Sequence, residues 1–376
     1  PEGVKGISLF VCPKFLVNDD GSLGERNDLV CASIEHKMGI HASPTAVMSF
    51  GDGPGAIGYL VGEPHKGLGY MFTMMNYARL NVGLEGVAIS ERAYQRARAY
   101  AIDRVQGRTL TEGSRGIIGH PDVRRMLMDM KARTEAMRAL AYFAAAQMDR
   151  AHSHADEATR VKSQALVDLL IPIVKGCCTE NAQGITADGV QIHGGMGFIE
   201  ETGAAQYVRD ARITTIYEGT TGIQANDLIG RKLIRDDGVT MKALLHTVSA
   251  EAQRQVGSGD PVLQALGQSL QRGLEALSQA TEWILTRANQ SPAATAAGAV
   301  PYLKLCGTVL GAWLMNRAAE AAQRQLNDNG QDDAFLSAKV ITARHYQYHV
   351  LVEANSWRDR VINGAISTLA LQDDQF

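Results

Sequence analysis

The chain has 376 residues, of which 45% are hydrophobic, 20% charged and 6% aromatic, so it is long enough to bury a large core. Its formal net charge is -3, from 37 basic and 40 acidic residues, and neither sign forms a long block. This balance argues against binding to nucleic acid or to a membrane surface through overall charge. The five cysteines lack the regular spacing of a disulfide scaffold, so we expect a reducing compartment, the cytoplasm.

Strands and turns are expected at the start of the chain, over residues 1–66. GISLFV and TAVMSF are short apolar or β-branched runs, while NDDG and GDGPG have turn chemistry. Residues 53–58 match the pattern GxGxxG of dinucleotide-binding folds, which requires a helix directly after it. The extended-looking sequence YLVGEP follows instead, so we interpret these residues as turn glycines.

Helical spacing of apolar residues begins near residue 68. Pro121 suits the first turn of a helix, whereas Pro172 is expected to kink or break the helix that contains it. The helices predicted in this part are 68–105, 121–154, 156–183, 200–210 and 220–235, with a glycine-rich connection over 106–120.

A domain boundary is expected at RDDG, residues 235–238, where the helical pattern stops. Beyond it the predicted helices are 239–256, 261–289, 300–327 and 333–370, with an alanine-rich linker over 293–299. The sequence thus predicts a mainly α fold with a small β part, in three domains that cover 1–66, 67–236 and 237–376.

The apolar stretch 305–315 is too short to span about 30 Å of hydrocarbon, so no integral membrane segment is expected. Its Gly307 and Gly311 indicate close helix packing. His152 and His154 lack a third ligand nearby, so no metal site is predicted. The adjacent Cys177 and Cys178 indicate two small buried side chains rather than a redox pair.

Residues 191–224 contain the strongest candidate site. Gly194, Gly195 and Gly197 remove side chains from a turn and allow a ligand to approach the backbone. Glu218 follows a semi-apolar run and precedes a helix, so it is a candidate general base. On spacing alone, an ordinary helix-start charge is the favoured interpretation. Burial would raise its pKa and a helix N-terminus would lower it, so the sequence leaves the balance open.

These residues also form a spaced motif, and they resemble the C-terminal signature of the acyl-CoA dehydrogenase family. The resemblance extends from residue 1 to about residue 235, and the block 300–327 is similar to the extra helical domain of larger members, a subgroup that includes methylmercaptopropionyl-CoA dehydrogenases. The motif consists of Gln191, Gly194, Gly195, Gly197, Phe198, Glu201, Arg209–Asp210–Ala211 and Ile216–Tyr217–Glu218–Gly219–Thr220.

The resemblance implies a fold and an activity. Residues 1–66 would be the second half of the middle β-domain, 67–236 the helical bundle, and 237–376 the extra domain. Glu218 would remove the α-proton of an acyl-CoA thioester, with hydride transfer from the β-carbon to the flavin N5 of FAD, and the product would be a trans-2-enoyl-CoA. A polarised thioester oxygen and aligned C–H bonds are the physical requirements of this step.

Several binding residues are implied in the same way. The resemblance assigns Asn76, Arg79 and Gly219 to the substrate, and Thr220 and Thr221 to the FAD of their own subunit. It also implies a homodimer or homotetramer, with an electron-transfer flavoprotein as electron acceptor. The residues assigned to the FAD of a neighbouring subunit are Arg104, Gln191, Ile192, His193, Gly194 and Gly195.

Three expectations complete the interpretation. The family's N-terminal helical domain and its strand segments for flavin should precede Pro1, so we expect a fragment of a longer chain that is inactive alone. An acyl-CoA oxidase is the nearest alternative enzyme, because the same base and flavin can pass electrons to oxygen. A DNA-binding flavoprotein of the family is the alternative outside enzymology, and it would require a basic face.

Overall fold

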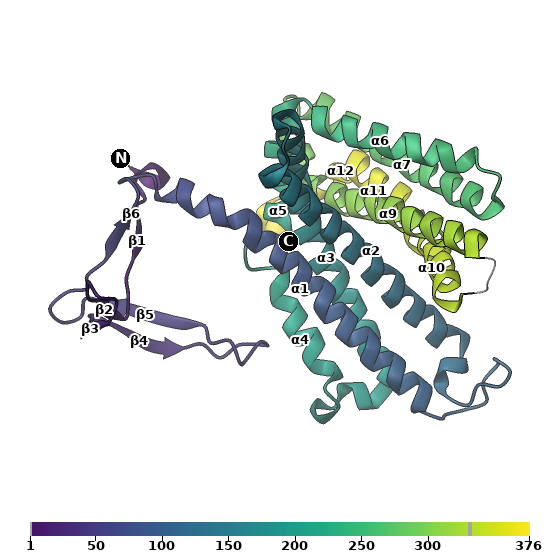
Figure 1. Cartoon of the computed structure of the whole chain (residues 1–376), viewed down its shortest axis with the longest axis horizontal. Helices are drawn as coiled ribbons and strands as arrows, with labels where there is room; N and C mark the ends of the chain where they lie inside the picture. The colour runs from purple at the N-terminus through teal and green to yellow at the C-terminus, as the bar shows by residue number, and fades with distance from the viewer. Residues whose placement is uncertain (1, 330–332) are drawn as a thin grey trace. The chain divides into compact units, whose positions relative to one another are not determined.

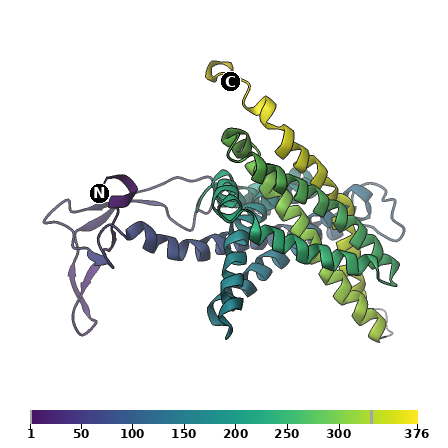
Figure 2. The ribbon, with the colours of Figure 1, turned by 90° about the horizontal axis from the view of Figure 1, so that it is seen from above.

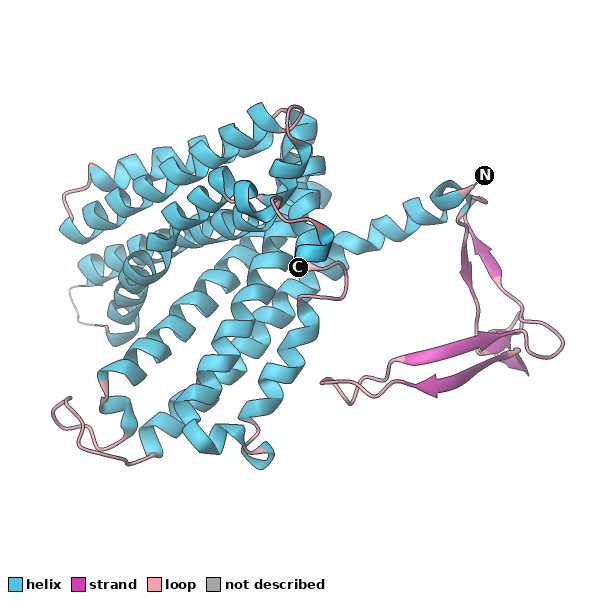
Figure 3. Cartoon of the chain, turned by 180° about the vertical axis from the view of Figure 1, so that it is seen from behind, coloured by secondary structure: helices cyan, strands magenta, loops and turns pink. Residues whose placement is uncertain are grey.

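The computed structural model describes residues 2–329 and 333–376. The chain divides into two compact units, Pro1–Ala78 and Arg79–Phe376, and helix α1 (Gly67–Asp103) contains the boundary between them. Figures 1 and 3 show that helices dominate and that the strands are confined to the N-terminal part. The predicted fold class, mainly α with a small β part, is therefore confirmed.

The strands of the first unit form three separate antiparallel pairs. Gly53 and Gly55 both donate backbone hydrogen bonds to Asp28 Oδ2 at 2.9 Å, and a strand begins at Tyr59, so residues 53–58 are turn glycines as predicted. The pairs are β1 (Leu9–Val11) with β6 (Tyr59–Val61), β2 (Phe15–Val17) with β3 (Leu23–Arg26), and β4 (Leu29–Ile34) with β5 (Ala46–Phe50).

The next part of the chain supplies the helices around the candidate site. Pro121 begins α2, as predicted. The predicted end of α3 at residue 183 is wrong, because the helix continues through Pro172 to His193. Pro172 lies in a fully buried stretch of α3, so packing on all sides offsets the missing backbone hydrogen bond. The elements are α2 (Pro121–Ser153), α3 (Glu157–His193), α4 (Ala204–Thr214), α5 (Thr221–Asp227) and the π-helical segment Leu228–Leu233.

The C-terminal part adds a second layer of helices, of which α6, α7 and α9 lie side by side in Figures 1 and 2. The expected linker 293–299 is instead the short helix α8, and the expected stretch 333–370 is interrupted by a π-helical turn at Tyr346–Val350. The helices are α6 (Val239–Val256), α7 (Pro261–Arg287), α8 (Pro292–Ala297), α9 (Ala299–Asn329), α10 (Ala334–His345), α11 (Ala354–Asn363) and α12 (Ala365–Thr368).

A large hydrophobic core runs through the second unit, from Leu80 to Val361. Asp237 and Gly238 interrupt the helices with positive φ angles of 52° and 73°, yet the core continues across them. Gly307 lies so close to α3 that an added Cβ would be 2.2 Å from Cys177 Sγ, which confirms the predicted close packing. Among the described residues, no helix combines the length and apolar character needed to cross a membrane.

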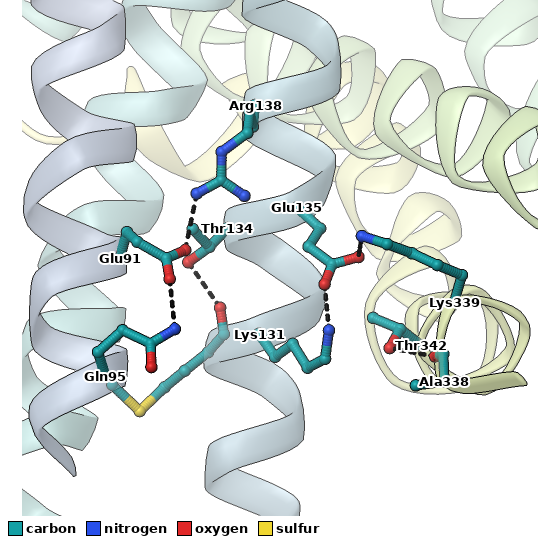
Figure 4. A network of polar contacts seen from close by, with 10 residues as sticks. Glu91, Gln95, Lys131, Thr134, Glu135, Arg138, Ala338, Lys339 and Thr342 are labelled. Carbon is teal, nitrogen blue, oxygen red and sulfur yellow. Dashed lines mark hydrogen bonds and ion pairs between the residues drawn. The ribbon is translucent and has the colours of Figure 1, made fainter. Parts of the chain in front are cut away.

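Polar contacts reinforce this packing at the helix surfaces (Figure 4). Glu91 of α1 accepts a hydrogen bond from Arg138 of α2 at 2.7 Å. Glu135 of α2 accepts one from Lys339 of α10 at 2.9 Å. The successive helices α1 and α2 and the distant helix α10 are thereby joined. These pairs are half-buried, so we expect each to stabilise the fold by about 1 kcal/mol or less.

Candidate functional site

Glu218 lies in the turn between α4 and α5, which we call the Glu218 turn (residues 215–220). Its φ angle is +53°, which is uncommon for a residue with a side chain, and Gly219 follows at +96°. An added Cβ on Gly219 would lie 2.8 Å from Gln224 Nε2, so glycine is required at this position. The turn ends at Thr220, whose hydroxyl accepts a hydrogen bond from the N–H of Ile223 and caps α5.

Two buried side chains anchor the backbone carbonyls of this turn. Gln224 Nε2 donates to the carbonyl of Glu218 at 3.1 Å and to that of Gly219 at 3.2 Å. Lys175 of α3 donates from Nζ to the same Gly219 carbonyl at 2.7 Å. Both Gln224 and Lys175 are completely buried. The carbonyls of Glu218 and Gly219 are therefore fixed by side chains that lie inside the helical unit.

The charges near Glu218 come from several elements. Burial, and after it the nearby Arg79, lower the pKa of Lys175 to about 8, although Glu180, Glu218 and Glu85 oppose the shift. The hydroxyl of Tyr217 donates to Glu85, and burial together with this carboxylate raises the pKa of Tyr217. The side chain of Glu218 itself is exposed on this chain, and thus accessible to a ligand.

Arg79, which the resemblance assigns to the substrate, forms a buried ion pair. Its Nη1 lies 3.1 Å from Asp227 Oδ2, and both side chains are less than 10% exposed. Within the described residues, Arg79 Nε has no hydrogen-bond partner. Arg79 is therefore not an exposed cation on the helix surface. The ion pair instead joins α1 to the end of α5, the helix that begins directly after the Glu218 turn.

Thr221 connects the site to the C-terminal helices. Its hydroxyl donates to Glu180 Oε1 of α3 at 2.7 Å, and Glu180 also pairs with Lys304 of α9 at 3.0 Å. Burial opposes ionisation of Glu180, but the hydrogen bonds from Thr221 and Lys304 outweigh it and lower its pKa. The first turn of α5 is thus linked to two long helices.

A second group of predicted residues lies at the C-terminal end of α3. Gln191, Gly194 and Gly195 are exposed, whereas Ile192 and His193 are buried. His193 Nδ1 lies 2.6 Å from the carbonyl of Gly189, and its ring stacks on Tyr100 with centroids 4.4 Å apart. Burial lowers the pKa of His193. Its side chain supports the end of the helix and leaves the backbone accessible.

Arg104 belongs to this second group through Tyr100. The N–H of Arg104 donates to the carbonyl of Tyr100 at 2.9 Å, so Arg104 lies one turn beyond the residue that stacks on His193. Glu180, the partner of Thr221, precedes Gln191 on α3 by a distance of about 16 Å at the usual helical rise. The structure therefore places the predicted residues in two separate groups, and Asn76 lies half-buried in the first unit.

The other candidates from the sequence have local roles. His152 Nδ1 contacts the carbonyl of Met148 at 2.8 Å, and the Cys177 and Cys178 thiols are buried, with burial raising both pKa values.

Elsewhere, donor atoms of Asp129, His345 and His349 lie within 4.8 Å of one another. Arg125 already pairs with Asp129 Oδ2 at 3.1 Å, and His345 hydrogen-bonds to Oδ1 at 2.8 Å. Protein groups therefore occupy both oxygens of the Asp129 carboxylate. We interpret the cluster as a polar contact between α2 and α10 rather than as a metal site.

Sequence reasoning did not identify Lys175, Gln224, Asp227 or Glu180 as part of the site. A signal for Lys175 was present, since it is the only charged residue between Asp168 and Glu180, in a run that includes LLIPIV. A single cation in an apolar helical stretch must find a buried partner. Which partner it finds depends on tertiary contacts.

Two family models match the chain in succession. "Acyl-CoA dehydrogenase, C-terminal domain" matches residues 65–234, and "Acetyl-CoA dehydrogenase C-terminal like" matches residues 242–372. The chain belongs to the acyl-CoA dehydrogenase family. The two matched ranges adjoin the interruption at Asp237–Gly238 from either side. The predicted boundaries 1–66, 67–236 and 237–376 stay a prediction.

Named relatives lie in the same family. The chain is 47% identical over 372 residues to 3-methylmercaptopropionyl-CoA dehydrogenase of Ruegeria pomeroyi, covering 98% of this chain and 62% of the relative. It is 36% identical over 376 residues to the broad-specificity linear acyl-CoA dehydrogenase FadE5 of Mycobacterium tuberculosis, covering 95% and 61%. The chain thus spans about three fifths of the length of these relatives.

Solved structures share the fold. Caenorhabditis elegans ACDH-11, solved in complex with C11-CoA, aligns with a TM-score of 0.75 at 19% identity over 99% of this chain and 58% of that chain. The acyl-CoA dehydrogenase from Bacillus anthracis, solved with FAD, aligns with a TM-score of 0.71 at 20% identity over 97% and 64%. At these identities the likeness concerns the fold alone.

Proposed function

We propose that the protein containing this chain catalyses the FAD-dependent α,β-dehydrogenation of an acyl-CoA thioester to a trans-2-enoyl-CoA, with Glu218 as the base. The observation that carries the proposal is the Glu218 turn. Its exposed carboxylate belongs to a residue with a left-handed backbone conformation, and buried groups fix the carbonyls of Glu218 and Gly219. Membership of the family and the relatives named as acyl-CoA dehydrogenases support this activity.

The turn suits the removal of an α-proton. A general base must lie within hydrogen-bonding distance of the proton that it removes, and the fixed turn limits where the carboxylate can go. In the described part of the chain, the N–H of Glu218 donates no hydrogen bond to another group. This N–H is therefore available to polarise the thioester oxygen as negative charge develops there. Glu218 would thus act through both its side chain and its backbone.

The residues present also fit FAD. Gly194 and Gly195 leave open space where a side chain would begin, and a flavin dinucleotide needs such accessible backbone. Arg104 and Gln191, which belong to the same group, are also exposed, and a guanidinium suits the anionic diphosphate. Thr220 and Thr221 provide hydroxyl groups in the first group of residues, at the Glu218 turn and the start of α5. When bound, the flavin supplies the acceptor for the hydride from the β-carbon.

The separation of the two groups supports a homo-oligomer. The resemblance assigns Arg104 and residues 191–195 to the FAD of a neighbouring subunit, and Thr220 and Thr221 to that of their own. A distance of about 16 Å along α3 between the groups is consistent with two different cofactor sites. We therefore propose a homodimer or homotetramer in the cytoplasm, with Asn76, Arg79 and Gly219 on the substrate side and an electron-transfer flavoprotein as acceptor.

Glu218→Gln in the full-length protein tests the proposed function. We expect turnover of a panel of acyl-CoA thioesters, including 3-methylmercaptopropionyl-CoA, to fall by about 1,000-fold, the usual effect of removing a general base. Glu282→Gln, an exposed change on α7, is the matched control and should leave turnover unchanged. Full activity of Glu218→Gln would refute the assignment of the base. Oxygen consumption that accounts for all turnover would favour the oxidase instead.

A further inference from the structure

Lys175 is the least expected residue of the site. It is completely buried, although it carries the only charge in its stretch of α3 between Asp168 and Glu180. Removing an ammonium group from water is unfavourable unless hydrogen bonds and opposite charges compensate. A lysine retained in such a place calls for a specific partner, and its partner is the turn that carries Glu218.

The contact made by Lys175 is specific. Nζ donates to the carbonyl of Gly219 at 2.7 Å, a distance typical of a charge-assisted hydrogen bond. The same carbonyl also accepts from Gln224 Nε2 at 3.2 Å. Glu218 and Gly219 both have positive φ angles, so the turn needs tertiary contacts to remain in this conformation. Lys175 provides the shorter of the two hydrogen bonds to the Gly219 carbonyl.

We propose that Lys175 is a positioning residue, which fixes the carbonyl of Gly219 and thereby holds Glu218 where it can remove the α-proton. This inference rests on the proposed function. Lys175 itself is completely buried and contacts the turn at the Gly219 carbonyl, so it acts through Glu218 and Gly219.

The charges around Lys175 make the effect dependent on pH. Arg79 and Glu85 face it from α1, Glu180 from α3, and Glu218 from the turn. Because burial lowers the pKa of Lys175 to about 8, its positive charge is present at neutral pH and is lost in mildly alkaline solution. Loss of the charge weakens the hydrogen bond to Gly219 and removes a cation near the carboxylate of Glu218. The rate should therefore decline above about pH 8.

The test compares Lys175→Met and Lys175→Gln in the full-length protein. Methionine removes both charge and donor, whereas glutamine keeps a donor. Lys162→Met, an exposed change on the same helix, is the matched control. For each purified protein we would measure flavin content, the melting temperature, and kcat and KM between about pH 6 and about pH 10, the range that brackets a lysine of lowered pKa.

We expect kcat of Lys175→Met to fall by about 100-fold, as misplacement of a reacting group by about 1 Å can produce, with KM changed much less. Lys175→Gln should lose less, and neither variant should show the decline of the wild-type rate near pH 8. Flavin content and melting temperature should not decrease, because a buried charge has been removed.

Each other outcome contradicts the inference. If the wild type is active and Lys175→Met has the same kcat, the role of Lys175 is refuted and the proposed function remains intact. A lower melting temperature with normal kcat per folded molecule would show a purely structural role. If Lys175→Met does not fold, an alkaline decline that persists in Lys175→Gln refutes the inference. An inactive wild type would refute the proposed function, and this inference with it.

Discussion

The two compact units of this chain differ in how their apolar residues are used. In Pro1–Ala78 the strands form isolated pairs, and Phe10 and Phe50 are each 56% exposed. In Arg79–Phe376 the core is closed, with Leu170 and Leu228 at 0% exposure. Two-stranded pairs are only marginally stable in isolation, whereas a shared helical core fixes its side chains. The Glu218 turn and its anchors Lys175 and Gln224 all belong to the unit with the closed core.

The largest loss of stability is expected in the unit with the closed core, at the ion pair of Arg79 with Asp227. Asp227→Ala leaves the buried guanidinium without its partner and should lower the free energy of unfolding by about 3–5 kcal/mol. Chemical denaturation followed by circular dichroism measures the change. The double variant Arg79→Met with Asp227→Leu should recover most of it, because no unpaired charge remains. A single variant as stable as wild type would show that the pair is not buried in solution.

A second pair of variants compares the units directly. Leu170→Ala should cost about 3 kcal/mol, because it opens a cavity in the closed core. Phe10→Ala, at an exposed position of β1, should change the free energy of unfolding by no more than about 0.5 kcal/mol. Denaturant melts of both variants provide the comparison. Equal losses would mean that Phe10 is as well packed as Leu170, and the contrast between the units would fail.

The third prediction is a gain in stability rather than a loss. A buried lysine whose pKa is lowered to about 8 disfavours folding at neutral pH, so Lys175→Met should raise the free energy of unfolding by about 2 kcal/mol after the loss of one hydrogen bond. The unfolded chain binds more protons than the folded one between about pH 8 and pH 10.5, so the wild type gains stability over this window and the advantage of the variant should shrink. Melts at pH values on both sides of this window check the sign.

Local features of the fold could be predicted from the sequence, whereas contacts between distant residues could not. Pro121 marked the start of α2, and the GxxxG at Gly307 and Gly311 indicated close packing, because these signals lie in neighbouring residues. The continuation of α3 beyond residue 183 was missed, since burial by other helices overrides the local effect of Pro172. The pair of Arg79 with Asp227 joins residues 148 positions apart, so no spacing pattern could reveal it.

The candidate site was foreseen in the same uneven way. The motif around Glu218 is a contiguous segment, and the sequence identified it together with the glycines at the end of α3. The anchoring of the turn by Lys175 connects α3 to a loop 44 residues away and follows only from the tertiary structure. The positive φ of Glu218 likewise has no signature of its own in the residue types.

Anaerobic reduction of the bound flavin by an acyl-CoA tests directly whether Glu218 is the base that removes the α-proton. It isolates the half-reaction in which the α-proton and the β-hydride leave, without any electron acceptor. We expect rapid bleaching of the flavin band in the full-length wild type, and a rate about 1,000-fold lower in Glu218→Gln with flavin content unchanged. Bleaching of Glu218→Gln at the wild-type rate would contradict this expectation.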